Sequence, residues 1–176
     1  MQHTITILVE NKPGVLARVA GLFARRGYNI ASLAVSITND PTVSRITLVA
    51  EGDEDTLAQI VKQTDKLIDV VRVADYTSTA VLQRELALYK VSAPLENRPA
   101  IMQIADVFRG NVVDMSPEDT FTIEVTGEPE KIDAMERLLA PYGIKETVRT
   151  GAIVMARGAT TAYGEGASST SGQATL

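Results

Sequence analysis

The stretch Glu10-Asn11-Lys12-Pro13-Gly14-Val15-Leu16 decides the fold, because it joins an alternating segment to a helical one. Before it, residues 3–10 place apolar side chains at every second position, which is typical of a strand with one buried face. After it, apolar side chains recur at helical spacing. We expect Pro13 in the first helical turn, with Asn11 capping the free amides and Gly27 ending the helix in the left-handed conformation.

Gly14 is the residue that points beyond the fold. A glycine in the first turn of a helix costs up to about 1 kcal/mol relative to alanine, so it needs a reason. Without a Cβ, a small anion can approach the free N–H groups at the helix start. Asn29 begins the next strand and is expected to return to the same loop end.

These groups together would suit an α-amino acid. The helix amides would bind its carboxylate, and the oxygens of Asn11 and Asn29 would bind its ammonium group. An ordinary loop with a capping asparagine and a turn glycine stays the simpler alternative on these residues alone.

Composition bounds the class of protein. The chain has 176 residues, of which 45% are hydrophobic and 22% charged, as in ordinary globular proteins. It has no cysteine, so disulfides and thiolate chemistry are excluded. A net charge of −5 and the lack of a basic patch argue against nucleic-acid binding. With no long apolar run and no signal-peptide pattern, we expect no membrane span and a cytoplasmic location.

The order of elements predicts an α+β fold. Strands are expected at 3–10, 30–38, 44–51 and 69–76, with helices starting near Val15 and Asp53. This βαββαβ order is the ferredoxin-like arrangement, an antiparallel sheet with both helices on one face.

The pattern then occurs a second time. Asn97-Arg98-Pro99-Ala100 echoes Asn11-Lys12-Pro13-Gly14, and Gly110-Asn111 echoes the end of the first helix. We therefore predict two tandem βαββαβ units, at residues 1–77 and 81–158, in place of one continuous α/β domain. Ala100 replaces the glycine, so the second unit is expected to keep the scaffold and lack the ligand pocket. Residues 159–176 are rich in Ala, Thr, Ser and Gly and are predicted to form a disordered tail.

Catalytic and metal-ligating patterns are missing from the sequence. The single histidine, His3, begins a strand and is expected to face solvent. Asp53, Glu54 and Asp55 suit the positive end of a helix better than a metal site. No nucleophile elbow or phosphate-binding loop occurs. We therefore expect no catalytic residues, no metal site and no cofactor in this chain.

The run over residues 9–35, from Val9-Glu10-Asn11-Lys12-Pro13-Gly14-Val15-Leu16 to Gly27-Tyr28-Asn29-Ile30-Ala31-Ser32-Leu33, resembles an ACT domain of one particular kind. It is similar to the small regulatory subunits of acetolactate synthase, also called acetohydroxyacid synthase. Further similarity lies in Arg84-Glu85-Leu86, Arg149-Thr150-Gly151 and Met155-Ala156-Arg157-Gly158. The resemblance covers about residues 2 to 158.

This resemblance implies a function that spacing alone does not give. Such subunits have no activity of their own; they activate a large catalytic subunit that carries thiamine diphosphate, FAD and magnesium. They confer feedback inhibition by valine, and in some members by leucine or isoleucine. The N-terminal ACT domain is expected to form a homodimer with the effector at the interface, and the C-terminal half to contact the catalytic subunit.

The effector-binding positions of that family fall on a small set of residues here. They are Asn11, Gly14 and Asn29, with neighbouring backbone at Val15, Leu16 and Ile30. A free-standing amino-acid sensor that acts on another target is the alternative function.

Overall fold

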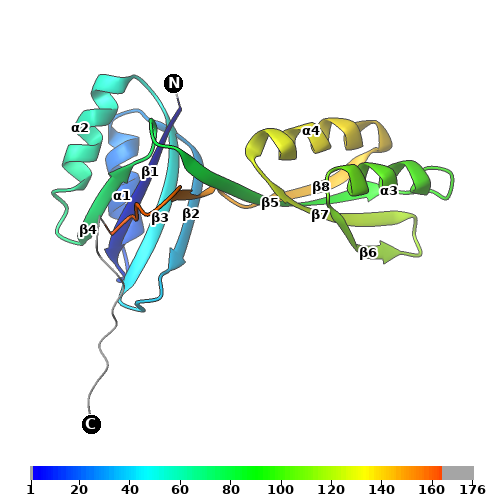
Figure 1. The fold of residues 1–176 in the computed structure, drawn as a ribbon, viewed down its shortest axis with the longest axis horizontal. Coiled ribbons are helices and arrows are strands. Elements are labelled where there is room, and N and C mark those ends of the chain that lie inside the picture. Colours follow the sequence, from blue (N-terminus) through cyan, green and yellow to red (C-terminus); the bar gives the residue numbers. More distant parts are fainter. Residues whose placement is uncertain (1, 164–176) are drawn as a thin grey trace, which may run out of the picture. The chain divides into compact units, whose positions relative to one another are not determined.

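The computed structural model describes residues 2–163, which form two compact units (Figure 1). Among the described residues, the first unit holds 2–82 and 151–163, and the second holds Gln83–Thr150. Each unit is a sheet with two helices packed on one face, so the predicted tandem ferredoxin-like α+β architecture is confirmed.

The first unit follows the βαββαβ order. Its elements are β1 (Gln2–Glu10), α1 (Val15–Arg25), β2 (Asn29–Ile37), β3 (Val43–Glu51), α2 (Glu54–Thr64) and β4 (Val70–Asp75). The strands are ordered β2-β3-β1-β4, and each pairs antiparallel with its neighbour. Strand β2 is therefore an edge strand.

The core of the first unit lies between this sheet and its helices. Helix α1 buries one stripe, and alternate residues of β1 and β3 meet it. The buried side chains include Ile5, Ile7, Val9, Val19, Phe23, Ile46, Leu48, Leu57 and Ile60. At about 25 cal/mol per Å², burying each of these side chains contributes about 1.5–3 kcal/mol to folding.

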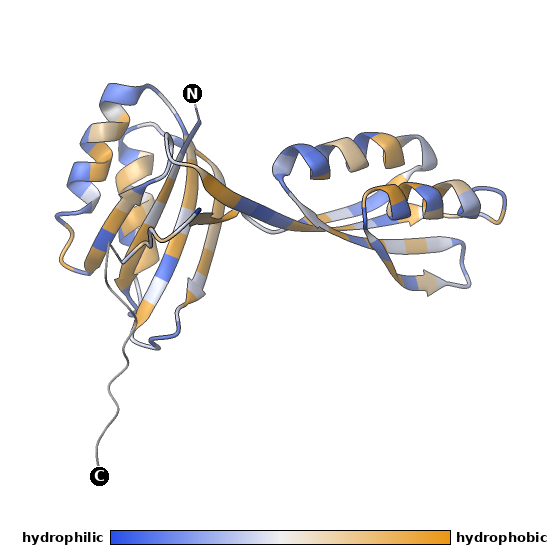
Figure 2. Cartoon of the chain, in the orientation of Figure 1, coloured by the Kyte–Doolittle hydropathy of each residue, from blue (hydrophilic) through white to orange (hydrophobic). Residues whose placement is uncertain are grey.

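The second unit repeats the order. Its elements are β5 (Val81–Ser92), α3 (Arg98–Val107), β6 (Asn111–Ser116), β7 (Thr120–Gly127), α4 (Pro129–Leu139), a 3₁₀ turn (Ala140–Tyr142) and β8 (Ile144–Arg149). Its strands are ordered β6-β7-β5-β8, so each strand occupies the place of its counterpart in the first unit. Polar and apolar segments alternate along both helices, as expected for one buried face (Figure 2).

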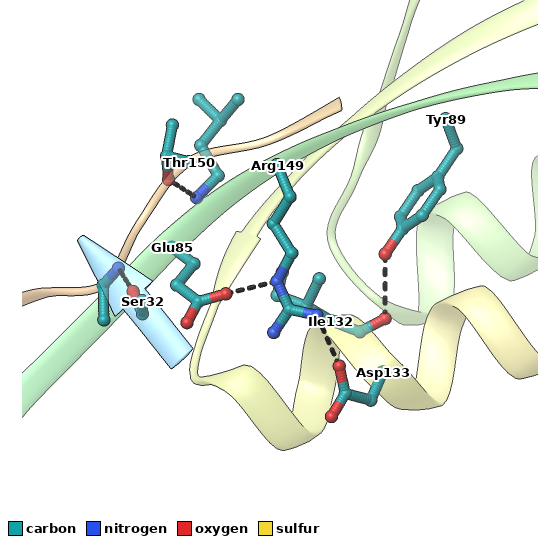
Figure 3. A network of polar contacts seen from close by, with 9 residues as sticks. Ser32, Glu85, Tyr89, Ile132, Asp133, Arg149 and Thr150 are labelled. Carbon is teal, nitrogen blue, oxygen red and sulfur yellow. Dashed lines mark hydrogen bonds and ion pairs between the residues drawn. The ribbon is translucent and has the colours of Figure 1, made fainter. Parts of the chain in front are cut away.

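A doubly paired arginine links three elements at the end of the second unit. Arg149 of β8 binds the carboxylate of Glu85 on β5 and that of Asp133 on α4, the latter at 2.6 Å (Figure 3). Burial alone would lower the pKa of Arg149, but its hydrogen bonds to Asp133 and Glu85 outweigh burial and raise it.

The domain boundary differs from the sequence prediction of 81–158. The last strand, β9 (Ile153–Ala156), pairs with β5, whose first two residues belong to the first unit. Arg157 N–H donates to the carbonyl of Ala80, and Val154 and Ala156 pack against Tyr76. These contacts place residues 151–158 in the first unit.

The first residues of the predicted disordered tail are ordered. Ala162 is buried, and Arg72 donates to the carbonyl of Tyr163 at 2.7 Å, so residues 159–163 belong to the first unit. The remainder of that prediction, residues 164–176, lies outside the described residues.

The prediction for His3 was wrong, because its side chain is 2% exposed. It lies inside β1, two residues before Ile5 and therefore on the helix-covered face. Its Nδ1 is 3.5 Å from the hydroxyl of Thr77. The expectation failed because β1 already pairs with β3 at Gln2. His3 therefore lies within the paired strand and not at a free end.

Candidate effector site

The loop before α1 differs from the predicted helical turn. Pro13 and Gly14 form a turn, and the helix begins at Val15 with Gly14 as its N-cap. Gly14 has φ +83°, in the left-handed region, and a Cβ there would meet no atom closer than Arg18 Nη1 at 3.9 Å. The reason for glycine is therefore the backbone conformation, since there is room for a side chain.

The N–H of Val15 donates to the carbonyl of Lys12 at 3.4 Å, and the next two amides of α1 are open. The carbonyl of Gly14 accepts the first helical hydrogen bond, from Arg18 N–H at 3.1 Å, and no side chain caps the helix. The N–H groups of Leu16 and Ala17 precede that bond, so the helix offers them no acceptor. They carry the partial positive charge of the helix start, which favours an anion.

Asn11 does not cap the helix, contrary to the sequence prediction. Its side-chain Nδ2 donates to the carbonyl of Pro41 at 3.0 Å, and its backbone N–H donates to Thr42 at 2.7 Å. Asn11 is therefore fixed to the turn between β2 and β3. With Nδ2 committed, Oδ1 is the remaining acceptor of this exposed side chain.

The turn that holds Asn11 is itself hydrogen-bonded. The carboxylate of Asp40 accepts from the hydroxyl of Thr42 at 2.6 Å and from its N–H at 2.9 Å. These two bonds lower the pKa of Asp40.

Two cations that the sequence analysis did not single out lie close to the open amides. Arg18, one turn after Gly14, forms an ion pair with Asp69 at 2.5 Å. Lys12 pairs with Glu10 at 2.6 Å, and this hydrogen bond raises the pKa of Lys12. The i, i+4 spacing of Gly14 and Arg18 is the signal that could have identified Arg18.

Asn29 lies far from Asn11 and Gly14 within one chain, so the expected return to the same loop end was wrong. Asn29 faces Glu51 at one end of β3, whereas Asn11 is bonded to Thr42, just before the other end. Strand β3 has nine residues and spans roughly 30 Å. Helix α1 returns the chain to the end of the sheet at which β1 begins, and β2 starts there.

The other predicted positions divide between the core and the surface. Val15 is buried, and half-buried Ile30 packs against the same core. Leu16 is 40% exposed. On β2, Val35 and Ile37 are also exposed, and Ile37 lies at the end of the sheet where Asn11 and Gly14 are found.

The corresponding loop of the second unit has a different geometry. Its helix α3 starts at Arg98 with Asn97 as the N-cap, so Pro99 and Ala100 are already helical. No left-handed residue separates the strand from the helix there. The guanidinium of Arg98 donates to the Ala93 carbonyl at 3.0 Å and pairs with Asp119 at 2.9 Å, close to the start of the helix.

The ends of the two helices match more closely than the sequence suggested. In α1, Gly27 has φ +74° and the N–H of Tyr28 donates to Phe23, which is a Schellman motif. In α3, Arg109 with φ 52° takes the left-handed place, and Gly110 N–H donates to Ala105 at 2.8 Å. Asn111 is therefore the true counterpart of Asn29.

No group of three or more His, Asp or Glu side chains that could hold a metal occurs within residues 2–163. Nor is any helix in this range long and apolar enough to cross a membrane.

Comparison with known proteins defines the class first. Residues 5–72 match the family model of the acetohydroxyacid synthase (AHAS) small subunit-like ACT domain, and residues 84–158 match that of the small subunit of acetolactate synthase. The tandem units thus define a regulatory subunit built on an ACT domain.

The relatives specify the family. The probable acetolactate synthase small subunits of Archaeoglobus fulgidus and Methanothermobacter thermautotrophicus are 51% and 52% identical over 158 and 160 residues. These matches cover 90% of this chain and 98% and 95% of those proteins. The crystal structure of the Thermotoga maritima small subunit aligns with a TM-score of 0.82 at 39% identity, covering 90% of this chain and 98% of that one. The chain belongs to the acetolactate synthase small-subunit family.

Proposed function

We propose that this chain binds a branched-chain amino acid, valine foremost, and thereby controls a large catalytic subunit of acetolactate synthase. Membership of the small-subunit family supports the partnership. The single observation that carries effector binding is the start of α1, where Gly14 holds open, uncapped amides beside Asn11 and Arg18. Thiamine diphosphate, FAD and magnesium are expected on the large subunit.

The chemistry of this site suits an α-amino acid. Its carboxylate would accept from the N–H groups of Leu16 and Ala17, close to the guanidinium of Arg18. Its ammonium group would donate to Oδ1 of Asn11. The branched side chain would lie on the exposed apolar surface of Leu16, Val35 and Ile37.

Asn29 joins this site only from a second copy of the chain. An antiparallel pairing of two β2 edges about a two-fold axis would bring the start of one strand to the end of the other. Asn29 of the partner subunit would then lie beside Ile37, at the end of the sheet that holds Asn11. The exposed edge and its apolar Leu33, Val35 and Ile37 support this pairing.

Regulation follows from linkage. An effector that bridges two protomers favours one arrangement of the ACT pair over others. If that arrangement activates the large subunit less, valine inhibits the enzyme, and a coupling free energy of about 1–3 kcal/mol is sufficient.

The test is a reconstituted assay of the large subunit with this chain, with and without valine. Gly14→Asp places a carboxylate beside the amides, and Asn29→Ala removes a charge-assisted hydrogen bond worth about 1.5–3 kcal/mol. Both variants should still activate the large subunit and should lose inhibition by valine. Full valine sensitivity in both would refute the site.

A further inference from the structure

We propose that residues 151–157, here called the C-terminal strap, hold strand β2 in place for effector binding. Ser32 on β2 and Gly151 on the strap are then positioning residues for Asn29, which begins the same strand. The inference rests on the proposed function, because it concerns the site that β2 completes.

The strap lies on the face of the first sheet that the helices leave open (Figure 1). Residues on this face alternate with the helix-facing core: Arg45, Thr47 and Val49 on β3 lie between Ser44, Ile46, Leu48 and Ala50. Arg45 Nη2 donates to the carbonyl of Val154 at 2.5 Å and is 3.5 Å from the Thr6 hydroxyl. Thr47 and Val49 are buried. The strap thus completes a second, smaller core of the first unit.

On β2 the strap makes two specific contacts. The N–H of Ala152 donates to the hydroxyl of Ser32 at 2.8 Å (Figure 3). Gly151 lies directly on the backbone of β2, where a Cβ would be 2.3 Å from the carbonyl oxygen of Leu33 and 2.9 Å from Ala34 N. Both contacts fall within five residues of Asn29.

This part of β2 needs support from outside its own ladder. Strand β2 is an edge strand with one paired neighbour, and its register to β3 shifts between Ile30 and Ser32. A bulge interrupts the ladder hydrogen bonds, so the residues beside it depend on other contacts. The strap attaches just beyond the bulge, at Ser32, and so fixes the strand next to Asn29.

The other end of the strap is fixed as well. Arg157 donates from its N–H to the carbonyl of Ala80, just before β5, and from Nε to the carbonyl of Val81, the first residue of β5. Between these ends, Ala152, Val154 and Ala156 are buried while Ile153 and Met155 are exposed. The strap is therefore held along its whole length by alternating buried side chains.

Two sets of variants in the full-length chain test this inference. Gly151→Ala adds a methyl group against the β2 backbone; its φ is not in the left-handed region, so the change acts through the contact alone. Gly21→Ala adds the same methyl group within α1, where it would lie at an ordinary 3.7 Å from Arg25 Nη1, and serves as its control. Ser32→Ala removes the acceptor, Ser32→Thr restores a hydroxyl, and Ser36→Ala is the control on exposed β2 surface.

Hydrogen exchange measures the protection of the backbone amides, and calorimetry measures the affinity for valine. In Gly151→Ala and Ser32→Ala, amides of the strap and of residues 29–34 should lose protection, and the Kd for valine should rise about fivefold or more. The two controls should match the parent chain, and Ser32→Thr should restore its affinity.

Each result decides the matter. Unchanged strap protection in both variants, or a released strap with unchanged protection of residues 29–34, would overturn the inference. So would a released strap with unchanged valine affinity. If the parent chain itself bound no valine, the proposed function would fail, while exchange at residues 29–34 would still test the strap.

Discussion

At the scale of single residues, conformation explains more than access. Glycine is favoured at position 14 because this residue, the N-cap of α1, has a φ of +83°. The helix begins at the next residue, Val15. The sequence singled out Gly14 for ligand access, whereas the structure shows that its backbone conformation favours glycine. The open amides at the start of α1 follow from the left-handed turn at Gly14. Hydrophobic periodicity in the sequence carries no information about φ.

Gly14→Ala should destabilise the first unit by about 1–2 kcal/mol, because an L-residue is strained at this φ although its Cβ has room. Gly14→Asn should cost less, since asparagine tolerates the left-handed region. Urea unfolding of the two variants measures the difference. Equal stability of all three proteins would contradict the assignment.

Arg109 offers the reverse experiment. It is an L-residue with φ 52° in the place that Gly27 fills in the first unit. Arg109→Gly should therefore stabilise the second unit by about 0.5–1 kcal/mol, the relief of strain being partly offset by backbone entropy. Arg109→Ala removes the same side chain and keeps the strain, so it should bring no gain in the unfolding midpoint.

At the scale of elements, the sequence predicted the order of helices and strands correctly. It was wrong in placing Asn29 at the same end of the sheet as Asn11. Alternation and helical spacing gave the βαββαβ order, because each element buries one face. The connection from β1 through α1 makes β2 parallel to β1, so Asn29 begins at the opposite end from Asn11. That rule was available from the sequence and separates the two asparagines within one chain.

The β2 edge is expected to be the dimer interface. Val35→Lys places a charge among the exposed apolar side chains of this edge, so it should shift the dimer towards monomer and weaken valine binding. Light scattering across a range of concentrations measures the shift. Ile68→Lys, at a 94% exposed position before β4, is the matched control and should change neither property.

At the scale of the whole molecule, the strap was beyond prediction from the sequence. Residues 152–156 are a short apolar run that fits the end of either unit, and nothing in their spacing names the strand they contact. Non-local contacts such as Ala152 to Ser32 are settled by tertiary packing. The echo between the two units hides a difference in the loop, since α3 begins before Pro99 and α1 begins after Gly14; that the second unit lacks a pocket stays a prediction.

The second unit should lose stability at alkaline pH. Burial raises the pKa of Tyr89 to about 12, and its hydroxyl donates to the carbonyl of Ile132 at 3.1 Å. Because the folded pKa lies above the ordinary tyrosine pKa of 10, this stabilisation is complete below pH 10 and is lost as pH rises towards 12. Tyr89→Phe should flatten that part of the unfolding curve, and an unchanged slope would contradict the assignment.

Valine calorimetry on a mixture of two inactive variants tests the shared site most directly. Gly14→Asp and Asn29→Ala each spoil every site of their own homodimer, but a mixed dimer would pair an intact Gly14 of one protomer with an intact Asn29 of the other. After subunit exchange, an equimolar mixture should bind valine at about one site per four chains. No binding by the mixture, with the parent chain binding normally, would contradict a site shared between two copies.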